Sequence, residues 1–463
     1  YAAGYTGKGI EVGVIGTGPI TDGDPRFTCS NASGCGDVAD FKHLYGVPGS
    51  GTVTQVFATD ANLPPNIPPS NEESSTGLAS PPPVTSPNIA ACAGIDPAQG
   101  VYPTDYTQCN PEDGEAQLDT QQIASLAYDA NVLFYIAYNP NECAQPTCAP
   151  GSGSGALGIS LSDDEIQQAI ADDRADVLSI SFGGNEASSK AIYFPNGTSG
   201  PGPTEFAMAA SEGMAIFASS GDFGAQGCTT GATVDPELCV SYPATDPSVV
   251  SVGGVNAPID QSGRLIGPLT AWGTQTGSQS DDSATGGGCS AYFSLLSYET
   301  GIPGETCTKR SQPDASLIGD LNTGVATDVD SAPSLGGRLL TPFGGTSVAA
   351  PELAAMWALV LQACKQHPGT CGMGSGATPY RLGNPNAYFY KIYKSGSNGV
   401  PYNGAFSDVQ YGNNTLVSPA PSSPSPAASA TPGPGFTATP GYDLTTGLGV
   451  PYARNLIKAV AGV

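Results

Sequence analysis

The sequence predicts an α/β fold in which a parallel β-sheet is covered by helices on both faces. Two observations predict it: short, continuous apolar segments recur along the chain, and segments rich in helix-forming residues separate them. Continuous apolar strands are buried on both faces, and alternating strands and helices produce a parallel sheet. The 463 residues allow two to four average domains or one large α/β domain.

The individual elements follow from the apolar periodicity and from turn residues. Strands are predicted over residues 9–15, 131–137, 177–181, 214–218 and 248–253, and helices over residues 115–130, 162–173, 204–212 and 352–363. Asp113 is a candidate cap for the first of these helices. Residues 47–110, rich in Pro, Gly, Ser and Asn, are predicted to form long loops, and the Pro/Ser-rich segment 418–440 an exposed loop.

The charge balance excludes two classes of partner. The chain has 15 Lys and Arg against 41 Asp and Glu, a net charge of −26 at pH 7. Nucleic acids and anionic membranes both require a basic surface, so we expect neither partner. No apolar run reaches the roughly 18 residues of a transmembrane helix. A chain with few bases gains little positive charge in acid, so the composition suits an acidic medium, and it equally suits ordinary solubility at neutral pH.

The twelve cysteines predict local disulfides in an oxidising compartment. No Cys-x-x-Cys occurs, which argues against a zinc or thioredoxin-type site. Taken in order along the chain, the cysteines form six pairs of near neighbours: Cys29 and Cys35, Cys92 and Cys109, Cys143 and Cys148, Cys228 and Cys239, Cys289 and Cys307, and Cys364 and Cys371. Glycosylation sequons at Asn31, Asn196 and Asn413 agree with secretion. The chain begins at Tyr1 without a signal peptide, as expected for a processed secreted protein.

A candidate nucleophile lies in the string Gly-Gly-Thr-Ser-Val-Ala-Ala-Pro at residues 344–351. Ser347 is placed on a Gly-rich turn at the start of an apolar helix. Free amides and the helix dipole at such a point stabilise an oxyanion, which a serine nucleophile requires. A plain capping serine is the alternative for a lone helix start, but the whole string is the nucleophile motif of subtilisin-like serine peptidases.

The histidine base of the subtilisin mechanism has no counterpart in the sequence. His43 and His367 are the two histidines, and neither lies in subtilisin's setting of glycine and small residues. Gly16 stands where subtilisins have their first-strand aspartate. The sequence therefore argues against a Ser-His-Asp triad.

A carboxylate pair can take the place of the histidine. Glu115 and Asp119 are four residues apart, on one face of the predicted helix. Two such carboxylates repel when both are ionised, so one pKa rises and the pair can share a proton. The pair could act as a base below about pH 5, where histidine, with a pKa of about 6.5, is protonated. Two solvated helix acids are the alternative.

A third acid follows the strand predicted at residues 214–218. Asp222 lies in Ser-Ser-Gly-Asp, at a strand end where α/β enzymes place functional groups. A protonated Asp222 can donate a hydrogen bond to an oxyanion, and we expect nearby carboxylates to raise its pKa. A turn aspartate before glycine would be the ordinary alternative.

Together these three motifs, in this order, resemble the sedolisin family of serine-carboxyl peptidases. The resemblance extends from about Gly7 to the C-terminus, includes Arg310 to Asp314 and residues 319–324, and implies a subtilisin-like fold formed by one catalytic domain over residues 1–463. It implies a Ser-Glu-Asp triad of Ser347, Glu115 and Asp119, with Asp222 in the oxyanion hole. Residues expected to line the substrate cleft are Ser179, Ser181, Phe182, Gly183, Gly184, Ser220 and Gly221.

The resemblance also implies a calcium ion in the region of residues 405–450. The expected ligands are the side chains of Asp408 and Asp443 and the carbonyls of Val409, Thr439 and Gly441. An all-oxygen set with two carboxylates suits Ca²⁺.

The implied activity is that of a secreted, acid-active endopeptidase, monomeric, with protein or peptide substrates and an inhibitory pro-domain before maturation. The alternatives are a tripeptidyl exopeptidase of the same family and a non-catalytic secreted binding protein. The first strand departs from the family, since it continues Gly16-Thr-Gly18 instead of an acidic residue followed by two glycines.

Overall fold

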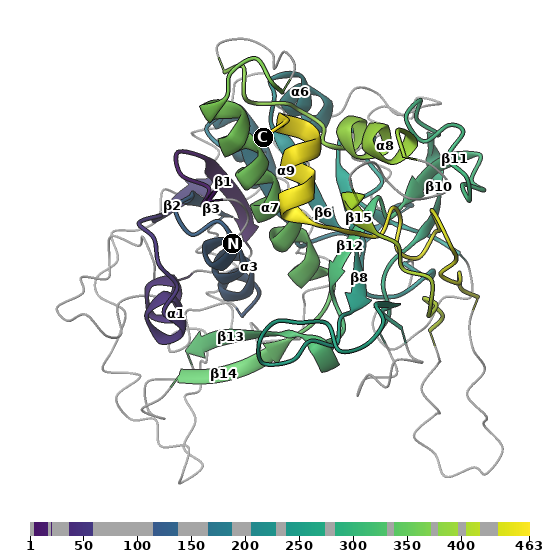
Figure 1. The fold of residues 1–463 in the computed structure, drawn as a ribbon, viewed down its shortest axis with the longest axis horizontal. Coiled ribbons are helices and arrows are strands. Elements are labelled where there is room, and N and C mark those ends of the chain that lie inside the picture. Colours follow the sequence, from purple (N-terminus) through teal and green to yellow (C-terminus); the bar gives the residue numbers. More distant parts are fainter. Residues whose placement is uncertain are drawn as a thin grey trace, which may run out of the picture.

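An eight-stranded sheet runs through the centre of the molecule, with helices in front of it and behind it (Figure 1). The computed structural model describes residues 4–16, 20, 37–58, 114–137, 165–187, 205–227, 238–273, 283–330, 338–371, 378–396, 404–416 and 434–463. Several sequence-based expectations concern positions outside the described residues: Asp113, the sequons at Asn31 and Asn196, and seven of the cysteines (Cys29, Cys35, Cys92, Cys109, Cys143, Cys148 and Cys228).

Seven strands form the hydrogen-bonded path β12-β8-β6-β4-β1-β3-β2, and every neighbouring pair in it is parallel. The eighth strand, β9, pairs antiparallel with β8. The bounds are β1 (Glu11–Gly16), β2 (Val53–Ala58), β3 (Asn131–Ala137), β4 (Val177–Ile180), β6 (Ala215–Ser219), β8 (Val250–Asn256), β9 (Thr270–Ala271) and β12 (Ala315–Ile318). The predicted parallel sheet is therefore confirmed.

Two apolar cores lie on opposite faces of this sheet because side chains alternate along each strand. One core contains alternate strand residues such as Val12, Val14 and Phe217 together with α3 (Gly114–Leu126), α7 (Thr346–Gln366) and α9 (Ala453–Ala461). The other contains Ile15 and Ile216 together with α6 (Glu205–Ser211) and the helix over residues 165–172. Helices thus cover both faces.

The smaller elements surround this core. They are α1 (Asp37–Tyr45), α8 (Asn386–Lys394), the 3₁₀ turn η6 (Leu321–Thr323), and four antiparallel pairs: β5 (Gly184–Asn185) with β7 (Ser241–Tyr242), β10 (Gly288–Ser294) with β11 (Lys309–Gln312), β13 (Val325–Asp330) with β14 (Arg338–Phe343), and β15 (Phe406–Ser407) with β16 (Val450–Pro451).

The structure corrects two boundaries. Residues 53–58, predicted as loop, form β2 at the sheet edge, where the pairing with β3 outweighs the loop-like composition on either side. The helix predicted over residues 352–363 is longer and begins at Thr346, so Ser347 lies within its first turn. The described end of the segment 418–440, residues 434–440, is mostly exposed as expected. Phe436 is partly buried and bonds this segment to Asn414, because its amide donates to Asn414 Oδ1 and its carbonyl accepts from the Asn414 amide.

Two of the expected disulfides are present in the described residues. Cys289 joins Cys307, and Cys364 joins Cys371, closing a loop at the end of α7. Cys239 is also disulfide-bonded. By length and composition α7 could cross a membrane, but 89% of its apolar window is buried, as expected of a helix inside a core.

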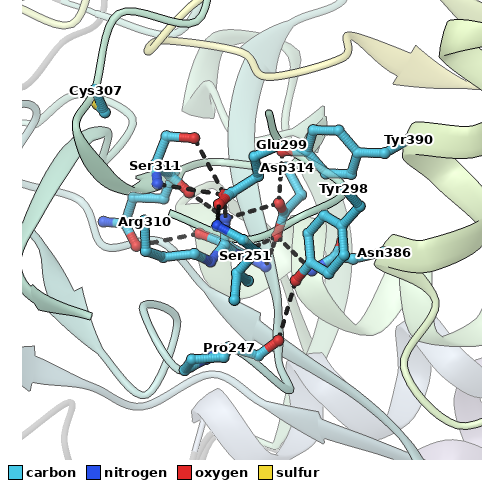
Figure 2. A network of polar contacts seen from close by, with 12 residues as sticks. Pro247, Ser251, Tyr298, Glu299, Cys307, Arg310, Ser311, Asp314, Asn386 and Tyr390 are labelled. Atoms are coloured by element: carbon cyan, nitrogen blue, oxygen red, sulfur yellow. Dashed lines mark hydrogen bonds and ion pairs between the residues drawn. The ribbon is translucent and has the colours of Figure 1, made fainter. Parts of the chain in front are cut away.

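A buried polar network connects β11, the residue before β12 and α8 (Figure 2). The Arg310 guanidinium, fully buried, forms ion pairs with Glu299 and Asp314 at 2.5 Å each. Asp314 also accepts hydrogen bonds from Asn386 Nδ2 (3.0 Å) and the Tyr390 hydroxyl (2.9 Å). A buried charge is tolerated only when it is paired and hydrogen-bonded, and this network meets that requirement.

Candidate active site

The candidate site residues gather at the carboxyl ends of two neighbouring strands. Ser181 follows β4, and Asp222 lies three residues beyond β6. Because β4 and β6 are parallel neighbours, the segments that follow them leave the sheet at the same edge. Helix α7, which starts with Thr346 and Ser347, packs across both strands.

The turn that precedes Ser347 requires glycine at position 345. Gly345 has a φ of 102°, which side-chain-bearing residues rarely adopt, and a Cβ there would lie 2.8 Å from Asp222 Oδ2. The missing side chain thus allows the Asp222 carboxyl to approach the start of α7. The first amides of a helix have no intrahelical acceptor, so the Ser347 amide is available as a donor.

Thr346 bonds this turn to the segment containing Asp222. Its amide and its hydroxyl each donate to Asp222 Oδ1 at 2.8 Å, and the same hydroxyl accepts from the Gly221 amide at 3.1 Å. Both bonds involve Oδ1, so Oδ2 is the oxygen that can hold a proton. The arrangement fixes the orientation of the carboxyl beside the start of α7.

Burial raises the pKa of the Asp222 carboxyl, and the two hydrogen bonds from Thr346 partly oppose the shift. The expected direction is confirmed, but its cause is different. We expected neighbouring carboxylates to raise this pKa, whereas removal from water is the leading cause.

Ser181 connects α3 to the start of α7. Its hydroxyl donates to Asp119 Oδ1 at 2.9 Å and lies 3.3 Å from the carbonyl oxygen of Ser347. Pro351 explains why that carbonyl is available: it stands four residues after Ser347, where a helix normally supplies an N–H, and proline has none. This proline is the signal in the sequence that could have predicted the bridging position of Ser181.

The two acids of α3 lie where the helix packs against α7. Glu115 is in the first turn of α3 and half-buried, and Asp119 is fully buried one turn later. A buried aspartate that accepts a serine hydroxyl is not a solvated helix acid, so the structure disagrees with that alternative for Asp119.

All but one of the expected cleft residues lie on the segments after the same two strands. Ser179 is fully buried within β4, while Phe182 is half-buried and Gly183 exposed beyond its end. Gly184 begins β5, which pairs with β7. Ser220 is buried, and its hydroxyl donates to the Gly286 carbonyl at 2.9 Å.

Both histidines are exposed and lie outside the segments that carry the candidate acids. His43 is exposed on α1, and His367 is exposed at the far end of α7, twenty residues after Ser347 and therefore about 30 Å along the helix. A Cβ at Gly16 would lie 2.1 Å from the Phe134 ring, so the first-strand aspartate position of subtilisins has no room for a side chain.

The residues expected to bind calcium also meet in the fold. The Gly441 amide donates to both carboxylate oxygens of Asp408, at 3.2 and 3.1 Å, and the Thr439 amide donates to Asp443 Oδ2 at 3.0 Å. Burial raises the pKa of Asp443 to about 6. Asp443 Oδ1 also accepts from the Thr445 and Thr446 amides, at 2.9 and 2.8 Å. No cluster of three or more His, Cys, Asp or Glu side chains able to hold a metal occurs among the described residues, so a calcium ion here would need backbone carbonyls as ligands as well.

Comparison with known proteins agrees with this geometry. Residues 109–378 match the model of the subtilase family, and sedolisin from Pseudomonas sp. (strain 101) is 30% identical over 67% of this chain and 45% of its own length. Kumamolisin from Bacillus sp. (strain MN-32) is 27% identical over 76% and 51%, and tripeptidyl-peptidase 1 from Dictyostelium discoideum is 28% identical over 61% and 38%. The chain thus spans about half the length, or less, of these relatives.

The solved structure of Pseudomonas sedolisin in complex with two molecules of pseudo-iodotyrostatin has the same fold. It aligns with 99% of this chain and 94% of its own, with a TM-score of 0.62 and 24% identity. The chain belongs to the subtilase family of serine-type peptidases. Within that family it is a member of the sedolisin group, with a subtilisin-like fold.

Proposed function

We propose that this protein is an acid-active endopeptidase that cleaves protein or peptide substrates through Ser347, Glu115 and Asp119. The observation that carries the proposal is the Ser181 bridge, because one hydroxyl contacts both Asp119 and the backbone of Ser347. The second support is the position of Asp222, which is bonded to the turn that carries the nucleophile.

In this mechanism the Ser347 hydroxyl attacks the peptide carbonyl while Glu115 takes its proton. The negative charge that develops on the carbonyl oxygen is stabilised by the Ser347 amide and by the proton on Asp222 Oδ2. Glu115 then gives its proton to the leaving amine, and water completes the hydrolysis with the same residue as base. Asp119, held by Ser181, orients Glu115.

Acid conditions suit both carboxyl roles. Asp222 donates only when protonated, and its burial extends the protonated state above the usual range of an aspartate. Glu115 must lose its proton to act as base, which sets a lower limit on pH. Activity should therefore lie between these two ionisations.

The carboxylates of Asp408 and Asp443, with the carbonyls of Val409, Thr439 and Gly441, would hold a calcium ion. The ion would supply positive charge to two acids, one of them buried, and would hold the loop around residues 439–443 to the segment of Asp408. It has no part in the chemical steps.

Secretion and maturation complete the proposal. The disulfides fit an oxidising compartment such as the extracellular space, where a monomeric enzyme would be released from an inhibitory pro-domain. Asn413 of the third sequon is half-buried, and its Oδ1 accepts from the Thr415 amide, a bond that does not involve Nδ2, the atom to which a glycan would be attached.

One digestion distinguishes the three candidate functions. A denatured protein is incubated with the enzyme at pH 3–4, and the products are identified by mass spectrometry. Internal cleavage supports the endopeptidase, and tripeptides released from N-termini support the exopeptidase, a candidate favoured by the similarity to tripeptidyl-peptidase 1. An absence of cleavage favours a binding protein.

A further inference from the structure

The hairpin formed by β13 and β14 holds α3 through a glutamine. Gln121 Nε2 donates to the Asp328 carbonyl at 2.8 Å, and the Asp328 amide donates to Gln121 Oε1 at 2.9 Å. The Gln121 side chain is fully buried. Its amide group therefore pairs with one residue of β13 as the peptide group of a neighbouring strand would.

A second contact lies at the other end of the hairpin. A Cβ on Gly114 would be 3.5 Å from the ring of Phe343, so that ring packs against the first residue of α3. Gly114 precedes Glu115, and Phe343 ends β14 four residues before Ser347. The hairpin thus contacts the start of the acidic helix where the chain is about to reach the nucleophile.

The two contacts have matching spacing along the helix and the hairpin. Phe343 pairs with Val325, and Asp328 is three residues further along β13, a strand length of about 10 Å. Gly114 and Gln121 are seven residues apart, which is about 10.5 Å along a helix. With both ends matched, α3 cannot slide along the hairpin without breaking one contact.

From this geometry we propose that Gln121 is a positioning residue, which sets Glu115 and Asp119 against Ser347 by bonding α3 to the hairpin that leads into the nucleophile turn. The inference rests on the proposed peptidase function. Gln121 is two positions after Asp119, so its side chain points to a different face of α3. It acts through the helix and has no contact with the reacting atoms.

The test compares Gln121→Met with Gln362→Met. Gln362 is also a buried glutamine with two hydrogen bonds to backbone, since its Oε1 accepts from the Thr6 and Gly7 amides, but it holds the N-terminal segment to α7. Both variants lose two bonds without losing volume. We expect kcat of Gln121→Met to fall by about 10- to 100-fold with KM little changed, because a misplacement of about 1 Å can cost 100-fold, while Gln362→Met keeps the parent's kcat. Equal kcat in the two variants would overturn the proposal.

A second variant tests the bonding pattern even if Gln121→Met does not fold. In Gln121→Glu the side chain can accept from the Asp328 amide at any pH, but it can donate to the Asp328 carbonyl only while it is protonated. Both bonds are therefore present together only in the protonated form. The ratio of variant to parent kcat should approach one at pH 3 and fall as the new carboxyl ionises. A ratio that is constant from pH 3 to pH 6 would show that the two bonds do not matter.

Failure of the proposed function gives a different result. If the folded parent cleaves nothing, the peptidase proposal is refuted, and the role of Gln121 falls with it. If the parent is active and only the comparison with Gln362→Met shows no difference, the positioning role alone is refuted.

Discussion

Replacing Ser181 by alanine should destabilise the protein through two acceptors at once. The hydroxyl donates to Asp119 Oδ1 and lies near the Ser347 carbonyl, which has no helical donor because residue 351 is proline. Asp119 is fully buried, so loss of the Ser181 hydroxyl removes a hydrogen bond that compensates for the desolvation of its carboxyl group. A buried acceptor left unsatisfied costs about 1–3 kcal/mol, and we expect Ser181→Ala to lower the free energy of unfolding by about that amount.

Pro351→Ala provides the matched change, because it restores the N–H that a helix would direct to the Ser347 carbonyl. The double variant should therefore recover part of the stability lost in Ser181→Ala. Urea unfolding of the parent, both single variants and the double variant at pH 4 gives the coupling energy, which we expect to exceed 0.5 kcal/mol, about the limit within which independent changes add. Simple additivity would refute the role assigned to Pro351.

Four further predictions concern the acids and the nucleophile. Ser347→Ala and Glu115→Ala should each lower kcat by roughly 10⁴–10⁶, with the double variant little worse, because residues that act as a unit are non-additive; near-normal kcat in Glu115→Ala would refute its role as base. The amide of Asp222→Asn donates at every pH, whereas the parent's Asp222, whose pKa is raised by burial, loses its proton as the pH rises. When kcat/KM is measured from pH 2 to 7, it should therefore fall less steeply toward neutrality in the variant than in the parent. Identical slopes would contradict a catalytic role for the proton on Asp222. Burial raises the pKa of Asp443 to about 6, so protons compete with calcium for its carboxylate below that pH. The decrease in Tm caused by a chelator should therefore become larger from pH 4 to 7 and be absent in Asp443→Ala, which calorimetry can measure. Burial also raises the pKa of Glu352 to about 8 in the folded state. Between about pH 4.5 and 8 only the unfolded chain releases this proton, so the free energy of unfolding should fall as the pH rises through that range. The urea midpoint should fall less across the same range in Glu352→Gln than in the parent.

The parallel sheet and the motif residues could be predicted from the sequence because each depends on local signals. Apolar runs revealed the central strands, and the eight-residue string revealed the turn at Ser347. The site between these segments was harder to predict. Asp119 and Ser181 are 62 residues apart, and their contact depends on which strand ends are neighbours, which periodicity does not determine.

The missed elements have the same explanation. Strand β2 lies between segments rich in Pro and Gly, and its place at the sheet edge comes from pairing with β3, a tertiary effect. The strands β13 and β14 pair locally, but the contact that bonds their hairpin to α3 is made by Gln121, 207 residues from Asp328. Burial, and not a neighbouring charge, governs the pKa of Asp222, and burial becomes known only with the fold.

Completion of the buried Arg310 network must wait until Tyr442 has been synthesised. Tyr442 donates to Ser311, a residue 131 positions earlier, and Ser311 in turn bonds to the Glu299 carboxylate that holds Arg310. Contacts between such distant segments slow folding, since a long loop must close before they form. For a protein proposed to be a peptidase, slow folding lengthens the time during which its own unfolded chain is open to cleavage.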